Sequence, residues 1–168
     1  MRIDKFTTKF QQALADAQSL AIGSDQQFIE PQHLLLALIN QDDGGTTSLL
    51  ARAGVNVPGL RRDLEQALTR LPKVEGHGGD VSIGRDLGNL LNLTDKEAQK
   101  RGDQFIASEM FLLALGEDKG EAGRLAKQHG LSRKALEAAI MAVRGGQGVD
   151  SQEAEGQRES LKKYCIDL

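Results

Sequence analysis

The chain has 168 residues, of which 39% are apolar, and its formal net charge at pH 7 is -3. This length predicts one compact domain, or two small halves that share a core. The basic residues are spread along the sequence and form no basic stripe, which argues against nucleic acid as a partner. No stretch approaches the about 18 apolar residues of a membrane span, and the start lacks the apolar run of a signal peptide. The one cysteine, Cys165, cannot form an internal disulfide, which fits a reducing compartment. Together these features lead us to expect a soluble, cytoplasmic protein with no membrane partner.

The first 72 residues predict four helices. The first helix has an apolar stripe at three- and four-residue steps, formed by Phe6, Phe10, Leu14, Ala17 and Leu20, and it should stop near Gly23. The second starts at Pro31, runs to about Asn40 and is apolar on several sides, as expected at the centre of a bundle. A short third helix covers 48–53. The fourth helix begins at Pro58 and ends at Pro72. Its predicted inner face is formed by Leu60, Leu64, Ala67, Leu68 and Leu71.

Residues 73–84 are polar and glycine-rich, and they predict an exposed loop between two halves. Residues 85–145 then repeat the plan of four helices, with an inner face formed by Leu87, Leu90, Leu91, Thr94 and Ala98 in the first of them. The period-2 alternation of a strand is absent up to residue 146. Residues 146–168 are mostly polar and predict a linker followed by the start of a further module.

The best-preserved part of this repeat lies at 28–38, where six of eleven residues are identical 77 positions later, at 105–115. Roughly one identity is expected by chance in such a window. An internal duplication therefore predicts an all-α fold of eight helices in two tandem pseudo-symmetric four-helix repeats, 1–72 and 85–145.

No catalytic constellation is evident in the sequence. His33, His77 and His129 have no carboxylate or cysteine partners at metal-ligand spacing, and the HExxH, GxSxG and GxxxxGK[ST] motifs are absent. We therefore expect no catalytic residue, metal or cofactor in this chain. An enzyme that uses the glycine-rich loop or the histidines is an alternative.

A duplicated bundle does create a seam between its halves. Its predicted walls are the first helix of each half and the segments before the second helices, with apolar Leu91 and Met110 near polar Thr7, Asp103 and Glu109. Such a groove would bind unfolded polypeptide weakly. Two alternatives stay open: Leu91 and Met110 belong to the core, and the two carboxylates only stabilise the loop and the start of the helix that contains Glu109.

Five segments carry a resemblance to a known family: 2–7, 13–21, 27–34, 98–103 and 161–164. They resemble the N-terminal domains of bacterial ClpB proteins, which are ATP-dependent disaggregases of the Clp AAA+ chaperones. The similarity covers essentially the whole chain. The segment Glu30-Pro31-Gln32-His33-Leu34 is typical of Clp N domains in general.

The resemblance implies a non-catalytic, all-helical domain that contacts unfolded or aggregated proteins and helps to deliver them to the pore of a homo-hexamer working with the DnaK chaperone system. ATP and Mg would bind in AAA+ modules beyond Leu168. Thr7, Asp103 and Glu109 match polar positions of the family's peptide-binding site, and Leu91 and Met110 match its apolar groove positions, where leucine is more usual than Met110. An alternative is the N domain of a protease-coupled Clp unfoldase that docks adaptor proteins.

Overall fold

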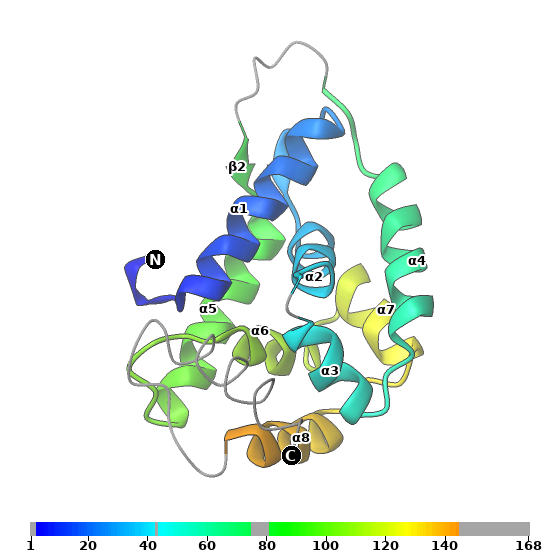
Figure 1. The fold of residues 1–168 in the computed structure, drawn as a ribbon. Coiled ribbons are helices and arrows are strands. Elements are labelled where there is room, and N and C mark those ends of the chain that lie inside the picture. Colours follow the sequence, from blue (N-terminus) through cyan, green and yellow to red (C-terminus); the bar gives the residue numbers. More distant parts are fainter. Residues whose placement is uncertain (1–2, 43, 75–80, 145–168) are drawn as a thin grey trace.

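The computed structural model describes residues 3–42, 44–74 and 81–144, and within these ranges it contains eight α-helices (Figure 1). The first four are α1 (Thr8–Gly23), α2 (Pro31–Ile39), α3 (Gly45–Arg52) and α4 (Val57–Thr69). The next four are α5 (Arg85–Lys100), α6 (Ser108–Leu115), α7 (Glu121–Gln128) and α8 (Arg133–Arg144). A short 3-10 helix, Ile3–Lys5, precedes α1. The predicted all-α fold of two successive four-helix repeats is therefore confirmed.

The helix ends follow from local chemistry. The side chain of Thr7 caps α1, because its hydroxyl oxygen accepts a hydrogen bond from the backbone N–H of Phe10 at 3.2 Å. The side chain of Asn56 caps α4 by accepting a hydrogen bond from the backbone N–H of Gly59 at 3.3 Å. Helix α3 begins three residues earlier than predicted, because Gly44, at φ 70°, adopts the left-handed conformation that allows the chain to turn into it.

Helices α2 and α6 are buried along their whole length, as predicted for the core helix of each repeat. The rings of Phe6, Phe10 and Phe111 continue this core, with centroids 4.8 and 6.1 Å apart along the row. The inner face of α1 differs from the predicted stripe, because Leu14 and Leu20 are only partly buried. Its buried residues are Phe10, Ala13, Ala17 and Ala21. Small side chains at these positions allow α1 to pack closely on α2.

The structure also contains two short strands that were not predicted. Strand β1 (Phe28–Ile29) pairs in parallel with β2 (Ser82–Ile83), and an isolated parallel bridge joins Phe6 to Ile106. Two residues are too few to show the alternation that identifies a strand in sequence. Strand β2 lies within the predicted loop 73–84.

Part of the predicted organisation falls outside the described ranges. Residues 75–80 of the predicted loop lie outside them, and so does the predicted linker and further module, 146–168, which includes Cys165. The boundaries of the two repeats therefore stay predictions.

The two repeats also contact each other through their later helices. Helix α3 packs against α8, and α4 packs against α7, which are equivalent contacts when the halves are exchanged (Figure 1). At their ends the backbones come close, since the backbone N–H of Asn56 donates to the carbonyl of His129 at 2.8 Å. A Cβ atom on Gly130 would lie only 2.8 Å from the carbonyl oxygen of Gly54, so this crossing requires glycine.

Candidate functional site

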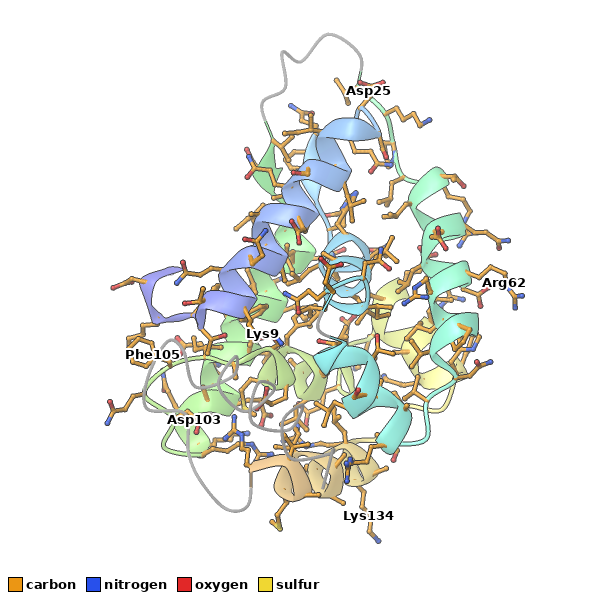
Figure 2. All side chains as sticks on the ribbon, viewed as in Figure 1. Lys9, Asp25, Arg62, Asp103, Phe105 and Lys134 are labelled. Carbon is orange, nitrogen blue, oxygen red and sulfur yellow. The ribbon has the colours of Figure 1, made fainter. Side chains whose placement is uncertain are left out.

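Asp103 and Glu109, the two carboxylates predicted for the site, lie close together because both bind Arg144. Asp103 stands in the loop between α5 and α6 (Figure 2), Glu109 in the first turn of α6, and Arg144 is the last residue of α8. The Nε atom of Arg144 donates to Glu109 Oε1 at 3.0 Å and its Nη1 atom to Asp103 Oδ1 at 3.0 Å, while Nη2 lies 2.9 Å from Asp103 Oδ2. We call Asp103, Glu109 and Arg144 the acidic clamp.

The acidic clamp is almost completely removed from solvent. The side chains of Arg144, Asp103 and Glu109 are 8%, 0% and 5% exposed. Burial alone would lower the pKa of Arg144, but Glu109, Asp103 and their hydrogen bonds outweigh it, so the pKa of this guanidinium is raised and it stays charged. The acidic clamp therefore sets two carboxylates against one charged guanidinium.

Sequence reasoning missed Arg144, although a signal was present. Leu136, Ile140 and Arg144 follow at four-residue steps, so an arginine continues the inward face of the last helix. A charge on such a face must find a buried partner, because an unpaired buried charge is strongly unfavourable.

The apolar residues predicted for the groove lie beneath the surface. Leu91 on α5 is 1% exposed and Met110 on α6 is 0% exposed, so both belong to the core and neither forms an open groove wall. Helices α5 and α6 pack against each other, and both residues are buried. Thr7 is also buried, and its backbone N–H donates to the carbonyl of Ile106 at 3.0 Å. A peptide-binding role for these residues stays a prediction.

The equivalent positions in the first repeat form an uncharged version of the acidic clamp. A shift of 77 positions relates Asp103 to Gln26 and Met110 to His33, and a shift of 76 relates Arg144 to Leu68. The Nε2 atom of Gln26 donates to the carbonyl of Leu68 at 2.6 Å, so the same loop again holds the end of the fourth helix of its repeat. The loop before the second helix therefore contacts the end of the fourth helix in both repeats, through a neutral hydrogen bond in the first repeat and through ion pairs in the second.

Histidine 33 completes this uncharged network. Its Nδ1 atom accepts a hydrogen bond from the backbone N–H of Glu30 at 2.8 Å, which leaves the Nε2 proton to donate to Gln26 Oε1 at 2.6 Å. Burial lowers the pKa of His33 to about 4, so the neutral ring is the form that fits the network. His33 is thus a structural residue of the core.

Two open surfaces lie elsewhere on the described part of the chain. A polar groove of about 670 Å³ runs along α1, directly after Thr7, and is lined by Thr8, Lys9, Gln12, Asp16, Asn40, Gln41 and Asp42. A smaller apolar pocket of about 160 Å³ lies beside β1, where Phe28 is 49% exposed and Val74 is 39% exposed. Both surfaces lie on elements that the sequence predicts as groove walls, α1 and the segment before α2, but none of the five predicted site residues lines them.

Within residues 3–42, 44–74 and 81–144, no group of three or more His, Cys, Asp or Glu side chains could hold a metal ion. In the same ranges no helix has the length and apolar character needed to cross a membrane.

Comparison with known proteins identifies the family of this chain. The family model described as "Clp repeat (R) N-terminal domain" matches residues 5–129. The chain is 52% identical to the chaperone protein ClpB of Vibrio cholerae and 48% identical to that of Pseudomonas putida. Each match covers 100% of this chain and 20% of the relative, so the chain spans about a fifth of the length of these relatives.

Solved structures share the fold. The N-terminal domain of Hsp104 from Candida albicans matches with a TM-score of 0.78 at 24% identity, covering 90% of this chain and 99% of that one. The N-terminal domain of the caseinolytic protease associated chaperone ClpD from Arabidopsis thaliana matches with a TM-score of 0.61 at 22% identity, covering 84% and 98%. The resemblance to ClpB N-terminal domains is thereby confirmed, and the chain belongs to the Clp repeat N-terminal domain family.

Proposed function

We propose that this chain is the polypeptide-contacting, non-catalytic domain of an ATP-dependent disaggregase chaperone. The observation that carries the proposal is the acidic clamp, where two carboxylates meet one arginine within the second repeat. Its carboxylates stand where the first repeat has the uncharged Gln26 and Gln32. The 52% identity to a ClpB chaperone along the whole chain supports the same function.

The chemistry of the acidic clamp suits unfolded polypeptide. Carboxylates accept hydrogen bonds from backbone N–H groups and pair with lysine and arginine, both of which an unfolded segment presents. The polar groove along α1 begins next to Thr7 and offers an open surface for the rest of such a segment. Binding should be weak, because an unfolded segment loses conformational entropy when it is held.

The remaining roles belong to the full-length protein. ATP and Mg would bind in AAA+ modules, and a homo-hexamer working with the DnaK chaperone system in the cytoplasm would draw polypeptide into its pore. This domain would hold the unfolded or aggregated protein before that step.

The test is a titration of the 168-residue chain with a fluorescently labelled, permanently unfolded protein. Asp103→Asn and Glu109→Gln should each weaken binding at least threefold, because each removes a negative charge at little change in size. Glu65→Gln removes a charge from an exposed position on α4 and should leave binding unchanged. Leu91→Gln is unsuitable, since it would bury an amide in the core. Equal affinities for all four proteins would overturn the proposal.

Docking of folded adaptor proteins remains the alternative, since the N-terminal domain of a protease associated chaperone has the same fold. The two functions differ in what they bind. If a folded adaptor binds the chain while unfolded proteins do not, the alternative replaces the proposal.

A further inference from the structure

We propose that Arg144 is a built-in competitor for the acidic clamp: an arginine or lysine of the bound polypeptide replaces its guanidinium, and the last turn of α8 is released. This inference rests on the proposed function and adds its regulation. Arg144 thereby becomes a positioning residue that links occupancy of the site to the point where the chain leaves the second repeat.

The first step is the accessibility of the carboxylates. With Arg144 in place, the side chains of Asp103 and Glu109 are 0% and 5% exposed, and three nitrogen atoms of the guanidinium lie 2.9 to 3.0 Å from their oxygens. A polypeptide cation cannot occupy these positions at the same time. Binding at the two carboxylates therefore requires the guanidinium to move.

The second step is that the fold does not require charge at this contact. In the first repeat, the hydrogen bond from Gln26 to the carbonyl of Leu68 closes the equivalent contact without any charged group. A buried ion pair must overcome the desolvation of its charges, so it contributes little net stability compared with a neutral contact. The charged version in the second repeat permits exchange of one cation for another, which the neutral contact of the first repeat does not.

The third step is the uneven attachment of α8. Its first residue, Arg133, is held by three carboxylates, those of Glu97, Glu117 and Glu137, at 2.8 to 3.3 Å. In its last turn Met141 is 71% exposed and Ala142 is also exposed, while Val143 packs partly buried against the core, so Val143 and the acidic clamp hold this end. Loss of the Arg144 contacts would free the last turn while the start of α8 stays in place.

Coupling of this kind is reciprocal. If a polypeptide cation releases Arg144, then removal of Arg144 must strengthen binding of that cation by the same free energy. Ligands without cations gain nothing from the exchange. The inference therefore predicts a stronger affinity after a substitution inside the site, and only for basic ligands.

The experiment uses the 168-residue chain and two fluorescein-labelled, unstructured 15-residue peptides of equal apolar content, one with three arginines and one with three glutamines in their place. Arg144→Met should bind the arginine peptide about fivefold or more tightly than the unsubstituted chain, within the usual range of coupling. Its affinity for the glutamine peptide should stay within about twofold. Arg124→Met is the matched control, because it removes the same charge from an exposed arginine on α7 and should change neither affinity.

A second measurement needs no variant. Saturation of the unsubstituted chain with the arginine peptide should speed amide hydrogen exchange at 141–144 and leave exchange in the first turn of α8 unchanged. Arg144→Lys keeps the positive charge but loses the planar guanidinium, so it should bind the arginine peptide with an affinity between those of the unsubstituted chain and Arg144→Met. This variant replaces Arg144→Met in the test if Arg144→Met does not fold.

Unchanged or weaker binding of the arginine peptide by Arg144→Met would overturn the inference, as would protection of 141–144 by the peptide. If the unsubstituted chain binds polypeptide and Asp103→Asn weakens that binding, the proposed function stands even when Arg144→Met gains nothing. If the unsubstituted chain binds neither peptide nor unfolded protein, the proposed function and this inference both fail.

Discussion

Phe6 forms a parallel bridge with Ile106, and a shift of 77 positions relates this bridge to the pairing of Ile83 with Ile29. In both cases, the segment before the first helix of one repeat pairs with the segment before the second helix of the other. The two repeats are therefore joined by crossed pairings and not only by contact between finished bundles.

The two crossed pairings should contribute unequally to stability. Phe6 is fully buried and its ring lies 4.8 Å from that of Phe10, whereas Ile83 is 44% exposed. Phe6→Ala should lower the free energy of unfolding by about 3–5 kcal/mol, and Ile83→Ala by about 1 kcal/mol. Urea unfolding followed by circular dichroism measures both. Equal losses would show that the pairing itself, and not side-chain burial, stabilises the seam.

The pKa of His33 predicts acid sensitivity. Its pKa is about 4 in the folded protein and near 6.5 in the unfolded chain, so the unfolded state binds more protons between these values. The stability that neutral His33 contributes is complete above about pH 6.5 and is lost as the pH falls towards 4, by up to about 3 kcal/mol.

The variant His33→Gln isolates this effect. Urea unfolding at pH 7 and pH 4.5 should show a smaller loss of stability on acidification in the variant than in the unsubstituted chain. Burial and the charge of Asp86 raise the pKa of Glu30, which acts in the opposite direction, so the difference between the two proteins is the quantity to compare. Parallel pH profiles would contradict the role assigned to His33.

Arg133 should stabilise the second repeat. It donates to Glu97, whose side chain is 5% exposed, at 2.8 Å, and this hydrogen bond is the main reason why the pKa of Glu97 is lowered. Arg133→Met leaves Glu97 with a weaker partner and should lower the free energy of unfolding at pH 7 by about 1–3 kcal/mol.

The effect of Arg133 should also depend on pH. Because the pKa of Glu97 is depressed in the folded protein, its contribution is present above about pH 4.5 and is lost as the pH falls through the folded pKa. The difference between Arg133→Met and the unsubstituted chain should therefore shrink on acidification, as measured by chemical unfolding at several pH values. A difference that is constant with pH would contradict this assignment.

Gly130 tests the close approach of the two repeats. It has φ 109°, and a Cβ atom there would lie 2.8 Å from the carbonyl oxygen of Gly54. Gly130→Ala should cost about 1–3 kcal/mol of stability, because both the backbone conformation and the space exclude a side chain. Gly23→Ala is the control, since a Cβ atom at Gly23 meets no atom within 4 Å, and it should be neutral or slightly stabilising. Thermal unfolding of both variants measures these changes in stability. An alanine at position 130 that costs no stability would show that the repeats can move apart.

The sequence by itself determined the helices and the duplication. The spacing of Leu87, Leu90 and Thr94 predicts the inner face of α5, and the structure buries all three. The identity between 28–38 and 105–115 predicts two equivalent core helices, and α2 and α6 are both fully buried. These features depend on neighbours a few residues apart, which is why a single sequence contains them.

Only the tertiary structure decided what covers each face. Periodicity places Leu91 and Met110 on helix faces, but whether those faces meet solvent or another helix depends on packing between α5 and α6. Arg144 lies 41 residues from Asp103 and 35 from Glu109, and no local pattern joins them. Long-range contacts of this kind come from the way the helices of the second repeat pack together, and they turn two carboxylates predicted to bind polypeptide into a buried clamp on the end of α8.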